Sequence, residues 1–210
     1  MGLAEFAPRA LRTSGFFRQL NRKRRIRQMR AQISSTDPIR VVIGAGPTRF
    51  SGWFQTDKEI LDVTKPSDWS ELFAPDSIDF LLSEHMLEHL TEQQAHVALS
   101  ECYRYLKPTG LFRIAVPDGN RRDEVYLREA SPPKDGHQVL YNVGTLSAAL
   151  QNVGFVTKPL EYFDKHEEFQ SVPWDESEGL IQRSVRFDSQ QEFQRGNLFY
   201  TSVIIDARKS

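Results

Sequence analysis

The segment RVVIGAGPTRF, residues 40–50, is the feature that most constrains what this chain can fold into. Val41–Ile43 form a continuous apolar run, which is typical of a strand covered on both faces in a parallel sheet. Gly44 and Gly46 follow directly, and residues without Cβ atoms let the backbone pass close to a ligand at the carboxyl end of such a strand. The segment therefore predicts an α/β domain with a ligand site where its first strand ends.

The length and composition suit one globular domain with an appendage. The chain has 210 residues, of which 39% are hydrophobic and 26% are charged, and a single hydrophobic core can reach this size. No run of about 18 apolar residues is present to span a membrane, and no apolar stretch of a secretory signal follows the basic N-terminus. The lone cysteine, Cys102, falls on the apolar side of a predicted helix, which indicates a buried thiol in a reducing compartment. We therefore expect a cytoplasmic protein.

The charge is divided unevenly between the N-terminal region and the rest of the chain. Residues 1–30 carry nine Lys or Arg and one Glu, a net charge of +8, whereas the whole chain carries −1, so the remaining 180 residues carry −9. Apolar residues recur at helical spacings among these charges, so residues 1–33 are expected to form a basic arm with a helix from about Phe16 to Gln32. Such an arm could lie on a membrane surface, on nucleic acid, or on an acidic surface of another subunit or of its own body, and a solvated helix packed back on the domain fits the sequence equally well.

The rest of the chain predicts alternating strands and helices after a linker. Residues 34–38, SSTDP, are rich in turn formers, so the globular domain is expected over residues 39–210. Strands are expected at residues 53–55, 60–63, 77–85, 110–116, 155–163 and 198–205. Helices are expected at residues 92–106, where Thr91 and Gln94 form a capping box, and at residues 123–130 and 145–152. Only some seven residues separate Gly46 from the second strand, too few for a full crossover helix. Residues 164–197 are polar and irregular, which predicts an insertion before the last strand.

In this order the motifs resemble the class I S-adenosylmethionine-dependent methyltransferases, and more narrowly a small type-11-like group of predicted methyltransferases. The resemblance covers about residues 39–160 and is carried by GAGPTRFSGWFQTD, LDVTKP, DSIDFLLSEHMLEHL, ECYRYLKPTGLFRIAVPD and HQVLYNVGTLSAALQNVGF. It implies an α/β, Rossmann-like sheet that is mostly parallel, with an antiparallel last strand and a shortened first crossover. It also implies methyl transfer from S-adenosylmethionine. Val42 stands where many members of this class have an acid, and Thr109 replaces a glycine of the usual turn.

The resemblance places the methionine end of the cofactor between two strand ends. Gly44, Ala45 and Gly46 would lie against its aminoacyl part. Ser83 and Glu84, at the carboxyl end of a later strand, would face the methionine moiety, because a carbonyl or carboxylate attracts its positive amino group.

The resemblance also assigns the nucleoside end of the cofactor to acidic residues. Asp57 resembles the acid at the end of the second strand that accepts both ribose hydroxyl hydrogen bonds, since a carboxylate offers two acceptor oxygens in one plane. Asp62, with the backbone of Val63, resembles the loop that receives the adenine amino group.

Three residues are candidates for handling the proton of an acceptor hydroxyl during methyl transfer. His85 follows the strand that would border the sulfonium, and histidine titrates near neutral pH. His137 lies in a loop that would cover the opening of the same cofactor site, and Asp118 follows the next strand. For His85 the alternative is a structural residue that hydrogen-bonds its own turn, and for His137 and Asp118 the alternative is substrate binding or loop structure.

The expected function is methyl transfer to an oxygen of a small-molecule or saccharide-like acceptor, because the resembling group is associated with bacterial glycan and cell-surface gene sets. One alternative is a catalytically silent methyltransferase-like binding module. Another is an RNA methyltransferase that uses the basic arm, although the acidic body would repel phosphate. A nicotinamide oxidoreductase is disfavoured, because Arg49 stands where the dinucleotide fingerprint needs its third glycine. No metal site is expected: His85 and His89 are spaced like zinc ligands, but no third ligand cluster has suitable spacing.

Overall fold

The computed structural model describes residues 15–187 and 202–209. Contacts between residues divide the chain into two compact units, residues 1–37 and residues 38–210. In the first unit the described part is a single helix, α1 (Gly15–Ile33), which contains seven Lys or Arg and no Asp or Glu. The helix predicted for the basic arm is therefore confirmed, while the start of the arm lies outside the described residues.

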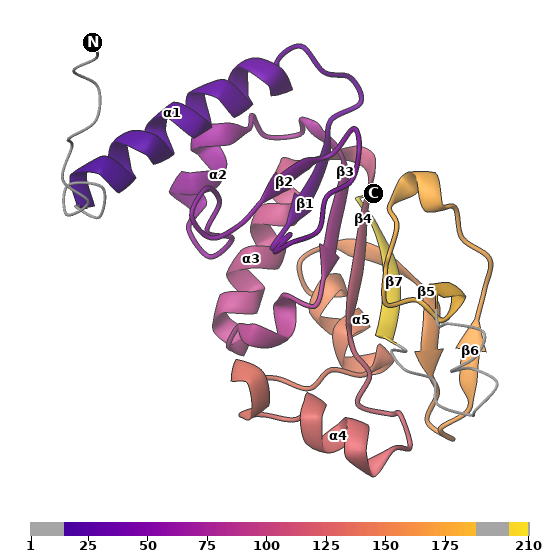
Figure 1. The fold of residues 1–210 in the computed structure, drawn as a ribbon. Coiled ribbons are helices and arrows are strands. Elements are labelled where there is room, and N and C mark those ends of the chain that lie inside the picture. Colours follow the sequence, from indigo (N-terminus) through magenta and orange to yellow (C-terminus); the bar gives the residue numbers. More distant parts are fainter. Residues whose placement is uncertain (1–14, 188–201, 210) are drawn as a thin grey trace, which may run out of the picture. The chain divides into compact units, whose positions relative to one another are not determined.

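The second unit is built on one seven-stranded sheet with strand order β2-β1-β3-β4-β7-β5-β6 (Figure 1). Its strands are β1 (Arg40–Ile43), β2 (Phe54–Thr56), β3 (Ile78–Glu84), β4 (Leu106–Pro117), β5 (Phe155–Phe163), β6 (Phe169–Ser171) and β7 (Ser202–Lys209). The helices are α2 (Pro66–Leu72), α3 (Glu92–Tyr105), α4 (Glu124–Ala130) and α5 (Val143–Gln151). Four short 3-10 turns complete the described elements: η2 (Leu87–His89), η3 (Lys134–Gly136), η4 (Glu176–Glu178) and η5 (Val185–Phe187).

The sheet has the topology of a Rossmann-like methyltransferase. Strands β2, β1, β3 and β4 are parallel, whereas β7 pairs antiparallel with both β4 and β5. The chain passes from β1 to β2 on one side and then to β3 on the other side of β1, so the strand order reverses at this point. No helix forms between β1 and β2. The predicted fold class, with its antiparallel last strand and shortened first crossover, is confirmed.

The segment from β3 to β4 forms because its local signals agree with one another. The Thr91 hydroxyl accepts from the Gln94 backbone N–H, and the Gln94 side chain accepts from the Thr91 backbone N–H, which closes the predicted capping box. The apolar face of α3 is buried, and it includes Cys102, which is 1% exposed as predicted. Helix α3 therefore covers the sheet beside β4.

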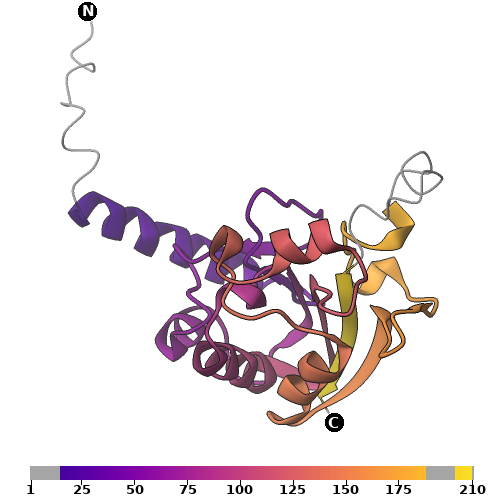
Figure 2. The ribbon, with the colours of Figure 1, turned by 90° about the horizontal axis from the view of Figure 1, so that it is seen from below.

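One face of the sheet is covered by helices. The ring of Trp69 in α2 stacks on that of Tyr105 in α3, with centroids 5.4 Å apart, and Tyr103 in α3 meets Phe155 of β5 edge to face at 5.1 Å. Figure 2 shows α3 and α5 side by side along the same side of the strands. These contacts supply the large buried surface that stabilises the domain.

The opposite face is covered by an irregular segment, residues 172–187, which takes the place of the missing crossover helix. Trp174 and Ile181 from this segment join a buried cluster with sheet residues that include Val42, Leu82 and Ala115. Much of the region predicted as a polar, irregular insertion is thus packed on the sheet. Residues 188–197 of that region lie outside the described residues.

Three sequence predictions need correction or refinement. Residues 60–63 do not form a strand: Ile60 and Leu61 are buried in a loop, and α2, which the sequence did not predict, follows at once. Pro159 predicts either an edge strand or a bend; it lies at an irregularity in the pairing of β5 with β7, but β5 is an interior strand. The last strand runs over residues 202–209, later than expected, and residues 198–201 lie outside the described residues.

Within residues 15–187 and 202–209, no helix combines the length and apolar character that a membrane span requires.

Candidate functional site

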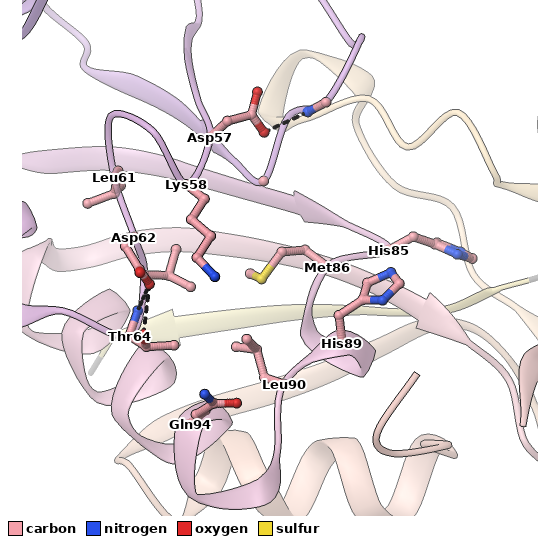
Figure 3. Close-up of a pocket in the computed structure, with 13 residues that line it drawn as sticks. Asp57, Lys58, Leu61, Asp62, Thr64, His85, Met86, His89, Leu90 and Gln94 are labelled. Atoms are coloured by element: carbon pink, nitrogen blue, oxygen red, sulfur yellow. Dashed lines mark hydrogen bonds between the residues drawn. The ribbon is translucent and has the colours of Figure 1, made fainter. Parts of the chain in front are cut away.

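A cavity of about 390 Å³ opens at the carboxyl ends of β1, β2 and β3, where the strand order reverses. Open α/β sheets bind ligands at this position, because loops diverge there and leave a crevice. Figure 3 shows the residues that line it, among them Asp57, Asp62, His85 and Met86. We call it the first cavity.

The glycine turn after β1 forms one wall of the first cavity. Gly44 and Gly46 have positive φ angles, 64° and 51°. A Cβ at Gly44 would lie 2.4 Å from Cγ of Met86, whereas a Cβ at Gly46 would meet no atom within 4 Å. Gly44 is therefore required by the packing of the protein itself, and Gly46 leaves open space for a ligand.

Asp57 follows β2 and stands at the edge of this turn. One of its oxygens, Oδ1, accepts a hydrogen bond of 2.9 Å from the backbone N–H of Gly46. That bond fixes the carboxylate beside the glycine turn. The neighbouring Lys58 extends its side chain into the middle of the view in Figure 3 and brings a positive charge to the cavity.

The loop with Asp62 and Val63 forms the facing wall. Oδ1 of Asp62 accepts hydrogen bonds from the backbone N–H and the hydroxyl of Thr64, at 3.2 Å and 2.7 Å. Burial opposes ionisation of Asp62, but the hydrogen bonds from Thr64 and Lys65 outweigh it and hold the pKa of Asp62 below its usual value. This wall thus presents a carboxylate held in place by hydrogen bonds, beside the apolar side chains of Leu61 and Val63.

A second cavity, of about 240 Å³, adjoins the first and shares His85 and His89 with it. Its other lining residues include Glu88 on η2, Arg183 from the segment that covers the sheet, and His137 from the loop after η3. Two sequence-predicted residues, His85 and His137, are therefore brought together at this second cavity.

His85 sits between the two cavities in a fixed orientation. Its φ angle is 53°, an uncommon value for a residue with a side chain. Its Nε2 lies 2.8 Å from the Ser202 hydroxyl, which itself donates to the carbonyl of Arg183 at 3.3 Å. Because that hydroxyl has one hydrogen, His85 donates through Nε2 and keeps its lone pair on Nδ1. Burial and the nearby Arg183 hold the pKa of His85 well below its usual value, so the ring is neutral.

Glu88 and His89 follow His85 closely in the chain and line the second cavity with it. Glu88 is 1% exposed, and burial raises its pKa to about 7. One of its oxygens is 3.5 Å from Nδ1 of His85. Burial and the neighbouring His137 lower the pKa of His89. The floor of the second cavity thus gathers several groups that can exchange protons or bind a cation.

Comparison with known proteins finds similarity to methyltransferases over the part of the chain that forms the first cavity. Residues 43–114 match the family model described as a methyltransferase domain. No curated protein matches the chain.

Solved structures of methyltransferases are similar to this chain. A methyltransferase from Archaeoglobus fulgidus, described as dependent on S-adenosylmethionine, is 16% identical, with a TM-score of 0.50, and the match covers 91% of this chain and 94% of that one. An S-adenosylmethionine-dependent methyltransferase from Mesorhizobium loti is 14% identical, with a TM-score of 0.46 and coverage of 87% and 96%. The family model and the fold together support S-adenosylmethionine-dependent methyl transfer as the class of activity.

Three residues predicted as cofactor contacts lie outside the lining of the first cavity. Ala45 belongs to the buried cluster beneath the sheet, and Ser83 is completely buried. The carboxylate of Glu84 accepts backbone hydrogen bonds from Gln182 and Arg183, at 3.1 Å and 2.7 Å. Glu84 therefore anchors the segment over the sheet.

Asp118 lies outside the lining of both cavities. Its two oxygens accept backbone hydrogen bonds from Asn120 and Phe163, at 2.9 Å and 2.7 Å. Burial raises the pKa of Asp118, and these hydrogen bonds oppose the rise. The arrangement favours a structural role, in which Asp118 ties the loop after β4 to the end of β5.

Other lining residues were not predicted from the sequence. They are Lys58, Leu61, Thr64, Met86, Leu90 and Gln94. The sequence identifies Gln94 only as part of the capping box of the helix predicted at residues 92–106. Lys58, Leu61, Thr64 and Met86 lie within a few residues of a position that was predicted to bind the cofactor, whereas Leu90 and Gln94 lie farther along the chain.

Proposed function

We propose that this chain binds S-adenosylmethionine in the first cavity and transfers its methyl group to an oxygen of a small-molecule or saccharide-like acceptor in the second cavity. One observation carries the proposal: the first cavity lies at the point where the strand order reverses, between the glycine turn and the carboxylates of Asp57 and Asp62. This is the place and the chemistry that an adenine nucleoside with a charged tail needs.

The lining residues suggest how the cofactor would lie. Asp57 would accept hydrogen bonds from the ribose hydroxyls, and Asp62 with the backbone of Val63 would receive the adenine amino group. Leu61, Val63 and Leu90 would contact the flat faces of the base. Gly44 and Gly46 would leave room for the methionine end.

The second cavity supports an oxygen acceptor. Methyl transfer forms a bond between the acceptor oxygen and the methyl carbon while the carbon–sulfur bond breaks, so the products are a methyl ether and S-adenosylhomocysteine. The hydroxyl proton must leave, and His85, which lines both cavities, is the residue that we propose accepts it. Glu129, Asp135 and Arg183 give this cavity the polar lining that an acceptor rich in hydroxyl groups would use.

Binding of the cofactor is tested by calorimetry on the full chain with S-adenosylmethionine and with S-adenosylhomocysteine. Both are expected to bind, and Asp57→Asn should weaken both by roughly tenfold or more, because a hydrogen bond to a charged group contributes about 1.5–3 kcal/mol. The matched control is Asp76→Asn, in a turn that lines neither cavity. If neither compound binds, the silent binding module is the better description.

Methyl transfer itself is tested by incubating the chain with cell extract and S-adenosylmethionine carrying a labelled methyl group. Label is expected in a small-molecule or saccharide fraction, and His85→Ala should lower the rate of transfer by about 10²–10⁴-fold with only a small change in cofactor affinity. Label in RNA instead would favour the nucleic-acid alternative. An unchanged rate in His85→Ala would remove this residue from the mechanism.

A further inference from the structure

Three side chains at the floor of the second cavity can each direct one ligand atom to a common point. They are Glu88 and His89 on η2 and His137 in the loop before α5, and their candidate ligand atoms all lie within 4.8 Å of one another. The sequence alone offered His85 and His89 as a pair. In the structure His85 contacts Ser202, and His137, which is remote in sequence, supplies the missing ligand.

The burial of the Glu88 carboxylate requires an explanation. Its side chain is 1% exposed, and among the described residues neither carboxylate oxygen accepts a hydrogen bond. Nδ1 of His85, whose ring is neutral, lies 3.5 Å from one of these oxygens. Burying a carboxylate without hydrogen bonds or a cation is costly, and buried charges are ordinarily paired or coordinated to metals.

His137 is held as a metal-binding histidine usually is. Its Nδ1 lies 2.7 Å from the carbonyl oxygen of Ala130, and a carbonyl only accepts, so Nδ1 carries the hydrogen and Nε2 keeps a lone pair. Such a hydrogen bond from the second ring nitrogen to a carbonyl fixes the tautomer and the orientation of a ligating imidazole. His89 hydrogen-bonds the backbone of Gly136, and its ring lies at 71° to that of His137 with centroids 4.8 Å apart.

The backbone holds the three ligands in one place. The carbonyl of Glu88 accepts hydrogen bonds from the N–H groups of Gln138 and Val139, at 2.7 Å and 3.2 Å. These bonds join η2 to the loop that carries His137. The cluster is therefore built by two segments fastened to each other rather than by exposed side chains that happen to be near.

We propose that Glu88, His89 and His137 bind one divalent transition-metal ion, for which Zn²⁺ is the best match. Two imidazoles and one carboxylate with an open fourth position are a common ligand set of exposed zinc sites. Ligand atoms in a tetrahedral zinc site lie about 3.3 Å apart, given bonds of about 2.0–2.1 Å. The three side chains must therefore close by roughly an ångström or more at their widest separation, which side-chain rotation can provide.

The position of the ion follows from its ligands. All three line or border the second cavity, so an open coordination position would face the proposed acceptor. An ion there would bind the acceptor oxygen and make its hydroxyl more acidic, beside His85. This consequence rests on the proposed function, whereas the metal site itself does not.

The test is metal binding by the full chain, prepared without a histidine tag and freed of metal with a chelator. Titration with Co²⁺ is expected to give visible absorption bands of a coordinated ion at one ion per chain, and Zn²⁺ should displace them. His89→Ala, His137→Ala and Glu88→Gln should each lower the affinity for Co²⁺ by roughly tenfold or more. His96→Ala, which removes an exposed histidine of α3, is the matched control and should leave it unchanged.

Two results would overturn the metal site: no binding of Co²⁺ or Zn²⁺ by the wild-type chain, or equal affinity in the wild type and all three ligand variants. Circular dichroism shows whether each variant is folded, and Glu88→Gln keeps the size of the side chain, which an alanine would not. The titration contains no S-adenosylmethionine, so its result is separate from that of the cofactor experiment.

Discussion

The two glycines of the turn after β1 are needed for different physical reasons. Gly44 is enclosed, because a Cβ there would collide with Met86, which lies on the loop after β3. Gly46 faces open space at the first cavity. The sequence predicted a close approach of backbone to ligand at both positions, but only the position of Gly46 leaves room for one.

Substitution of Gly46 tests this difference. Gly46→Ala is expected to weaken binding of S-adenosylhomocysteine by roughly tenfold, because the methyl group would enter the cavity. Gly52→Ala is the control: Gly52 also has a positive φ, 78°, and open space around it, but it lines neither cavity. Both variants should lose a similar 1–2 kcal/mol of unfolding free energy from the strained backbone, measured by denaturant titration. Equal loss of cofactor affinity in the two would mean that strain alone, not contact, explains the effect.

Thr109 shows a limit of prediction at the scale of single residues. The sequence indicates that one residue of the KPTG turn takes a positive φ, and glycine is the usual candidate. In the structure Thr109 takes it, at 65°, while Gly110 is needed because a Cβ there would lie 2.7 Å from the side chain of Leu106. Only the packing around the turn decides which of the two residues carries the strain.

The elements that the sequence predicted are those whose signals are local. The unit from β3 through α3 to β4 has a capping box, helical periodicity and a proline in its closing turn, all of which lie within a few residues of the structure they determine. The stretch of residues 60–63 has the composition of a strand but is a buried loop ahead of α2. The apolar residues correctly indicate that this stretch is buried. They do not indicate its backbone conformation, which depends on hydrogen bonds that the hydrophobic pattern does not reveal.

The segment of residues 172–187 could not be predicted, because its anchors are distant in sequence. Arg113 of β4 is fully buried, pairs with both oxygens of Asp206 at 2.7 Å and 2.9 Å, and donates to the carbonyls of Asp175 and Gly179, each at 2.6 Å. Glu161 of β5 accepts from Trp174, Ser184 and Val185. Nothing in the local sequence indicates that these two charged residues are buried, yet they fasten residues 172–187 to the sheet.

Arg113 should therefore be among the most sensitive positions of the fold. Arg113→Met is expected to lower the free energy of unfolding by about 3–5 kcal/mol, because it leaves Asp206 as an unpaired buried charge. The control is Arg208→Gln, which removes an exposed ion pair with Glu178 and should cost less than about 1 kcal/mol. Denaturant titration gives both values. Limited proteolysis near residues 172–187 should be faster in Arg113→Met alone, and similar stabilities of the two variants would contradict the anchoring role.

At the scale of the whole molecule, the site combines predictable and unpredictable parts. The order of the motifs places Gly46, Asp57, Asp62 and His85 at one edge of a parallel sheet, since the carboxyl ends of parallel strands meet there. The second cavity was less predictable: His137 was singled out, but its contact with His89 and Glu88 depends on how a loop folds back. Tertiary contacts decide which side chains a loop contributes to a site, and such contacts produce no recognisable residue spacing in the sequence.

The strongest asymmetry of the chain is its charge. Helix α1 carries seven positive residues and no negative one, whereas residues 31–210 are strongly acidic. Polyanions bind such a helix by releasing counterions, so the affinity falls steeply with salt. We predict that the full chain binds single-stranded RNA and vesicles with anionic lipids through this helix, and that neutral vesicles do not bind.

The dependence on salt makes this prediction quantitative. In a variant with Lys23, Arg24 and Arg27 changed to Gln, the slope of log K against log salt for single-stranded RNA should become shallower by about 2, since each lost phosphate contact contributes roughly 0.7. The affinity for S-adenosylmethionine should stay the same, because these residues line neither cavity. An unchanged slope would show that α1 does not contact the polyanion. Loss of RNA binding without loss of vesicle binding, or the reverse, would distinguish which of the two surfaces the arm recognises.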